Sequence, residues 1–161
     1  MQAEVRVDVD VRATPGEVWR WAVDWERQGD WLPLTQVRHV GGPALAVGTR
    51  ILARTGVGPV GFDDPMTLTA LDTPEAGPRS YEIVHTGRLV RGVGAFIVES
   101  VGESARFVWW ERVEVPGGPV APALWVVGGR LTRLVFGWAL RRFARAVEAD
   151  PARAAVTGTP G

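Results

Sequence analysis

The sequence predicts an α+β fold in which a curved antiparallel sheet of seven strands wraps around one long C-terminal helix. Apolar residues recur at helical spacing over residues 122–150, and the arginines there fall mostly elsewhere on the helical wheel. Most of the chain before that segment alternates apolar and polar residues, with turn signals about every eight to twelve residues. A lone long helix must bury its apolar face, and a sheet is the partner that this sequence offers.

The N-terminal part predicts a strand followed by two short helices. Residues 3–12 alternate valines with charged residues, which is typical of a strand with one buried face. Thr14 is a good N-cap, Pro15 fits the first helical position, and Glu17 completes a capping box. A second short helical turn is expected to end at residues 31–33, because proline disfavours helix in the residue before it.

The middle of the chain predicts a meander of six strands joined by turns. Glycine, proline and aspartate cluster between the apolar segments, as expected for antiparallel hairpins. The predicted strands are residues 35–40, 49–55, 66–71, 80–86, 91–100 and 105–115. Asp63 and Asp64, followed by Pro65, are interpreted as a turn that precedes the third of these strands.

Residues 1–150 are expected to form a single domain, and the Ala-, Gly-, Thr- and Pro-rich residues 151–161 a disordered tail. Two glycines, Gly128 and Gly129, interrupt the long helix. They leave three possibilities open: a ligand or a strand approaches the helix closely here, the helix kinks at this point, or it begins after Gly129.

Composition excludes several classes of chemistry. The formal net charge is +0, which favours neither nucleic acid nor an anionic membrane as a partner. The chain has no lysine and no cysteine, which rules out a lysine Schiff base, a disulfide, a thiolate metal site and a cysteine nucleophile. Neither a signal peptide nor a membrane span is expected, so the predicted location is cytoplasmic.

The predicted architecture implies an internal cavity. A helix about 10 Å wide covers only part of a curved seven-stranded sheet, so a space is expected between the two. The candidate ligand-binding residues share the expected inner faces of two strands or lie on the long helix. They are Tyr81, Ile83, His85, Phe107, Trp109, Glu111, Trp125, Leu131, Val135 and Trp138.

Several segments resemble the SRPBCC or START-like superfamily, which has the Bet v 1-like helix-grip fold, and within it the small bacterial members of polyketide cyclase/dehydrase type. These segments are residues 13–19, 24–25, 31–33, 85–92 and 109–112. The resemblance covers about residues 3–148 and implies binding of apolar or aromatic molecules in the cavity. Members include lipid carriers, hormone receptors and aromatase/cyclases, and they share no universal catalytic motif, so the resemblance assigns no catalytic residue.

His85 is the first candidate for chemistry, with Glu111 and Tyr81 as companions. Imidazole titrates near neutrality and can transfer protons, and a carboxylate opposite it would fix its tautomer. Three roles remain open for His85: a structural hydrogen bond, a ligand contact, or general acid–base catalysis. A buried Glu111 needs a partner, and Arg91 is an alternative to His85 in that role. With two histidines and no cysteine, no metal site and no cofactor are predicted.

The first functional hypothesis is a binding module for a small hydrophobic or aromatic molecule, selected mainly by cavity shape. The alternative from a different class is an enzyme similar to polyketide cyclases, in which His85, Glu111 and Tyr81 move protons on a folded poly-keto chain. A third hypothesis is a protein-interaction module whose cavity is filled by side chains and whose surface carries an exposed apolar patch.

Overall fold

The computed structural model describes residues 1–115 and 117–152, and its elements follow the predicted order. The predicted tail therefore lies, from residue 153 onward, outside the described residues. The elements are β1 (Gln2–Val11), α1 (Pro15–Ala22), α2 (Gln28–Trp31), β2 (Thr35–Gly41), β3 (Arg50–Val57), β4 (Val60–Asp72), β5 (Arg79–Thr86), β6 (Arg91–Val101), β7 (Ser104–Glu114), the 3₁₀ turn η1 (Gly118–Val120) and α3 (Ala121–Glu148).

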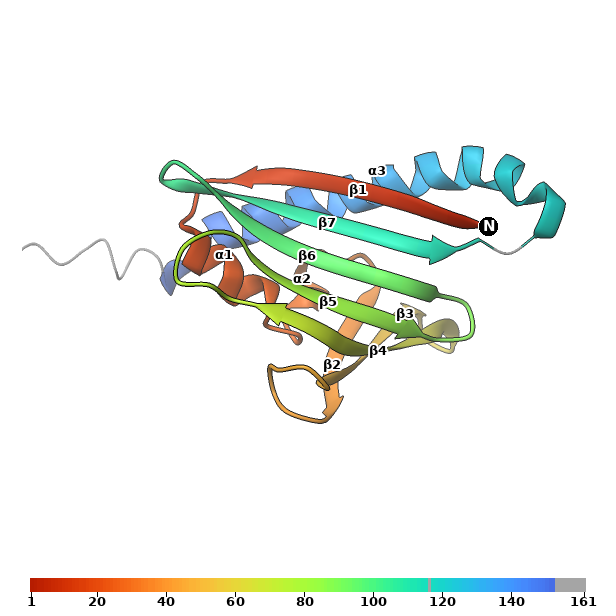
Figure 1. Ribbon diagram of the computed structural model, residues 1–161, viewed down its shortest axis with the longest axis horizontal. Coiled ribbons are helices and arrows are strands. Elements are labelled where there is room, and N and C mark those ends of the chain that lie inside the picture. The colour runs from red at the N-terminus through yellow and green to blue at the C-terminus, as the bar shows by residue number, and fades with distance from the viewer. Residues whose placement is uncertain (116, 153–161) are drawn as a thin grey trace, which may run out of the picture.

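The seven strands form one antiparallel sheet in the order β1-β7-β6-β5-β4-β3-β2. Figure 1 shows the sheet curving, with α3 running behind β1 and β7 and its last turns beside α1. Thr14 caps α1 with the predicted capping box, since its hydroxyl accepts from Glu17 N and the Glu17 carboxylate accepts from Thr14 N. The predicted fold class is confirmed.

One predicted boundary is wrong, and the error bears on the site. β4 begins at Val60, six residues before the predicted start at Met66, so Asp63 and Asp64 lie inside a strand. The turn of this hairpin is instead at residues 58–59, because Val57 and Val60 form the last pair between β3 and β4. Strand pairing overrides the local turn preference of an Asp-Asp-Pro sequence.

Aromatic rings from α2, α3 and the sheet form the centre of the core. Trp31 of α2 is fully buried and meets four other rings edge-on, including Phe143 of α3 with centroids 5.1 Å apart. Phe107 of β7 stacks on Phe143 at 4.1 Å. Offset and edge-to-face contacts of this kind add to the stabilisation from area burial. They fix the second half of α3 against the sheet.

The two halves of α3 differ in burial. Leu140 and Phe143 in the second half are fully buried, whereas Val127, Leu131 and Leu134 in the first half are 72%, 61% and 68% exposed. The expectation of one buried apolar face along the whole helix is therefore correct only for the second half. The helix is continuous from Ala121, so it does not begin after Gly129.

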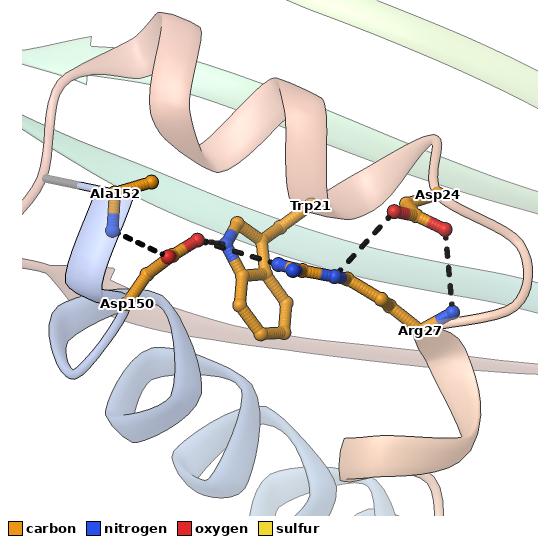
Figure 2. A network of polar contacts seen from close by, with 5 residues as sticks. All are labelled: Trp21, Asp24, Arg27, Asp150 and Ala152. Atoms are coloured by element: carbon orange, nitrogen blue, oxygen red, sulfur yellow. Dashed lines mark hydrogen bonds and ion pairs between the residues drawn. The ribbon is translucent and has the colours of Figure 1, made fainter.

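A polar network fastens the end of α3 to the helices that follow β1 (Figure 2). The Asp150 carboxylate accepts hydrogen bonds from Trp21 Nε1 at 2.7 Å and from Arg27 Nη1 at 3.3 Å. Arg27 also lies over the Trp21 ring and pairs with Asp24. The hydrogen bonds from Ala152 N and Trp21 lower the pKa of Asp150. The network therefore joins the C-terminal end of α3 to α1 and to the loop between α1 and α2.

Candidate functional site

A cavity of about 720 Å³ lies between the inner face of the sheet and the middle part of α3. Its walls come from all seven strands, from α2 and from α3 residues between Trp125 and Ala139. Most of the lining side chains are aliphatic or aromatic. Trp109 of β7 stacks on Phe136 of α3 with ring centroids 3.8 Å apart, and both residues line the cavity.

Three ionisable side chains meet at the cavity wall: Asp64 of β4, His85 of β5 and Glu111 of β7. They are 8%, 7% and 5% exposed. His85 Nδ1 lies 2.7 Å from Asp64 Oδ2, and His85 Nε2 lies 3.2 Å from Glu111 Oε2. Glu111 Oε1 accepts a further hydrogen bond from Trp109 Nε1 at 2.8 Å. We call Asp64, His85 and Glu111 the buried triad.

The strand register explains why these three residues meet. Met66 pairs with His85, and Asp64 lies two residues before Met66, hence on the same face of the sheet. β6 separates β5 from β7, and its Gly94 pairs with Glu111. A Cβ atom at Gly94 would lie 2.9 Å from Glu111 Oε1, so a glycine at this position gives the Glu111 carboxylate its room.

The carboxylates set the charge of His85. Burial by itself disfavours the imidazolium, but the hydrogen bond to Asp64 and the nearby negative charges of Glu111 and Asp64 raise the pKa of His85 to about 10. His85 is therefore protonated at neutral pH, and its Nδ1 donates to Asp64.

Three polar atoms of the buried triad have no hydrogen-bond partner among the described residues. Asp64 Oδ1, His85 Nε2 and Glu111 Oε2 are buried and make no hydrogen bond with any residue that the structure describes. His85 Nε2 and Glu111 Oε2 are close enough for an ion pair, but their orientation gives no hydrogen bond. Buried polar atoms normally have a partner, so each of these three atoms has an unmet hydrogen-bonding capacity in a residue that lines the cavity.

Tyr81 lines the cavity, but its hydroxyl belongs to the core. The hydroxyl donates to the Ala22 carbonyl at 3.1 Å and accepts from Gln28 Nε2 at 3.3 Å. Burial raises the pKa of Tyr81, so the phenol is neutral. The structure thus ties this hydroxyl to α1 and α2, and not to the proton-transfer role considered from the sequence.

The structure brings most of the predicted ligand-binding residues to the cavity, and it places two of them elsewhere. Those that line it are Tyr81, Ile83, His85, Trp109, Glu111, Trp125, Val135 and Trp138. Phe107 is fully buried in the aromatic core, stacked on Phe143. Leu131 is exposed on the first half of α3 and is not part of the cavity wall.

Asp64 is the member of the buried triad that sequence reasoning missed, and Phe136 of the cavity wall was missed as well. The position of Asp64 in a run of alternating inward residues, between Phe62 and Met66, was the available signal. Arg91, considered as a partner of Glu111, instead donates from Nε to the Gly87 carbonyl at 3.3 Å. Among residues 1–115 and 117–152, no group of three or more acidic and histidine side chains is arranged to hold a metal ion.

A comparison with family models identifies the family of the chain. The model for polyketide cyclase/dehydrase and lipid transport matches residues 2–148. The chain belongs to this family. The match spans nearly all of the described residues and confirms the superfamily that the sequence segments resemble. Comparison with curated protein sequences finds no match. In the part of the chain that the structure describes, no helix has the length and apolar character needed to cross a membrane.

Solved structures of similar fold place this family member among helix-grip proteins. The protein TTHA0849 from Thermus thermophilus has 17% identity and a TM-score of 0.71, over 91% of this chain and 98% of the other. The Zhui aromatase/cyclase from Streptomyces sp. R1128 has 16% identity and a TM-score of 0.67, over 99% and 100% of the two chains. Ara h 8.0201 has 12% identity and a TM-score of 0.64, over 93% and 100%. At these identities the likeness establishes the fold alone.

Proposed function

We propose that the protein binds a small, mainly apolar or aromatic molecule in the cavity between the sheet and α3. The observation that carries this proposal is a cavity of about 720 Å³ with an apolar wall and one buried polar cluster. Small-molecule sites have about this size, and a few convergent polar groups among apolar side chains orient the ligand. The open cavity also argues against an interaction module whose interior is filled by side chains.

The relatives are consistent with this proposal. The family description includes lipid transport, and one protein of similar fold is an aromatase/cyclase. Both roles require that a largely apolar molecule be held inside the protein. Trp109 and Phe136 add aromatic surface to the cavity wall, which suits an aromatic ligand.

A cyclase-like enzyme is the second candidate, and the unused Nε2 of His85 is the observation that favours it. In this alternative, the imidazolium would donate its proton to a carbonyl oxygen of the substrate. The raised pKa of about 10 weighs against it, because general acids work best with a pKa near the working pH. His85→Gln would support the enzyme if it abolished turnover of a poly-keto substrate and kept the affinity for a cavity probe.

Filling the cavity tests the binding proposal. N-phenyl-1-naphthylamine is an uncharged probe whose fluorescence rises in apolar surroundings, and wild-type protein is expected to bind it saturably at one site. Ala53 of β3 lines the cavity, so Ala53→Trp is expected to weaken binding by at least about tenfold, which is about 1.4 kcal/mol.

The matched control is Val84→Trp, since Val84 lies on β5 beside the cavity residue Ile83 but points to the opposite face. Its affinity for the probe is expected to stay within about twofold of wild type. Circular dichroism checks that both variants are folded. Absence of saturable binding to wild type, or equal binding by the folded Ala53→Trp variant, would refute the proposal.

A further inference from the structure

The ionisable groups along the cavity wall are unbalanced in charge. Besides the neutral Tyr81, they are Asp64, His85, Glu111 and Glu114, and no arginine among the described residues lines the cavity. The sequence has no lysine, so arginine and histidine are its basic side chains. Arginines of the sheet pair with acids on its outer face instead: Arg54 with Asp63, and Arg112 with Glu4.

The buried triad has the same excess of acidic over basic groups. It has two carboxylates and one imidazole, so even a fully protonated His85 leaves one negative charge in excess. The imidazolium is already shared, because its two nitrogens lie 2.7 and 3.2 Å from the two carboxylates. Asp64 Oδ1 and Glu111 Oε2 remain as buried oxygens without a hydrogen-bond donor among the described residues.

A ligand's polar end therefore meets two unused acceptor oxygens in a cluster with excess negative charge, beside one unused donor, His85 Nε2. An ionised carboxylate offers only acceptor oxygens, and at the triad it would face like charge away from water, where electrostatic repulsion is poorly screened. A hydroxyl group offers a donor hydrogen to an unused oxygen, and an ammonium group adds the opposite charge.

We infer that the cavity selects its ligand by charge: it accepts an apolar or aromatic molecule whose polar end is a hydroxyl donor or an ammonium group, and it rejects carboxylates. This inference rests on the proposed function, since it names the ligand class of the same cavity. A free fatty acid or an aromatic acid is excluded as the cognate ligand, and a phenol, an enol or an aromatic amine fits.

The test compares three probes of matched shape in competition with N-phenyl-1-naphthylamine at neutral pH: 2-naphthol, 2-naphthylmethylammonium and 2-naphthoate. 2-Naphthol and 2-naphthylmethylammonium are each expected to bind at least about tenfold more tightly than 2-naphthoate. Asp64→Asn removes the excess charge with little change of shape. It is expected to lower the ratio of the affinity for 2-naphthol to the affinity for 2-naphthoate by about fivefold or more. Glu111→Gln is a second variant with the same expectation, should Asp64→Asn fail to fold.

Asp63→Asn is the matched control, because Asp63 is the neighbouring residue, exposed and paired with Arg54 on the outer face. It should leave the ratio unchanged. Charge selection would be overturned if 2-naphthol and 2-naphthoate bound with equal affinity, or if neither competed with the probe. Binding of the uncharged probe itself would still support the proposed function. A ratio unaffected in folded Asp64→Asn and Glu111→Gln would also overturn it. Failure of the uncharged probe to bind wild type would overturn both proposals.

Discussion

Replacing His85 with glutamine is expected to lower the free energy of unfolding by about 3–5 kcal/mol at neutral pH. The change removes the cation that lies between Asp64 and Glu111 and leaves two buried carboxylates facing each other. Breaking a buried ion pair by removing one partner has this large cost because the remaining charge is uncompensated. Urea denaturation of wild type and variant measures the difference.

The pH dependence of the same experiment separates the charge effect from a packing effect. The pKa of His85 is raised in the folded protein to about 10, above its ordinary value of about 6.5. Its contribution to stability is therefore complete below about pH 6.5 and is lost as the pH rises through about 10. Wild type should lose a few kcal/mol over this range, and His85→Gln should lack that loss.

His39→Gln is the control, because His39 is exposed on β2. Its stability is expected to stay within about 0.5 kcal/mol of wild type and to follow the wild-type pH dependence. Parallel stability curves for wild type and His85→Gln between about pH 6.5 and pH 10 would contradict the charged triad.

Phe143→Ala is expected to lower the free energy of unfolding by about 3–5 kcal/mol, because it opens a cavity in the aromatic core. Phe143 is fully buried and contacts both Trp31 and Phe107. Leu131→Ala on the same helix is expected to change stability by less than about 0.5 kcal/mol, since Leu131 is largely exposed. Urea denaturation of both variants tests the difference between the two halves of α3, and similar losses would contradict it.

The sequence predicted the fold well because each element carries a local signal. The valines of residues 3–12 alternate, the capping box around Thr14 begins α1, and turn residues separate the strands. Each signal depends on near neighbours in the chain. The one large boundary error, at β4, arose because Asp63, Asp64 and Pro65 favour a turn locally while pairing with β3 holds them in a strand.

The site was predicted in part, for a related reason. Alternation placed His85 and Glu111 on the inner face, and the structure brings them together across Gly94. Alternation gives the face of a residue but not its depth, so it did not separate Phe107 in the core from Trp109 at the cavity wall. Helical periodicity likewise did not predict that Leu131 is exposed. Its burial depends on where α3 crosses the sheet, and the pattern of the helix alone does not give that position.

A crystal structure of the protein with 2-naphthol tests the central claim most directly. The predicted result is a ring in the cavity between the sheet and α3, with its hydroxyl within hydrogen-bonding distance of Asp64 Oδ1, His85 Nε2 or Glu111 Oε2. Naphthol bound only on the exposed face of α3, or in the cavity with its hydroxyl directed away from the buried triad, would contradict the claim.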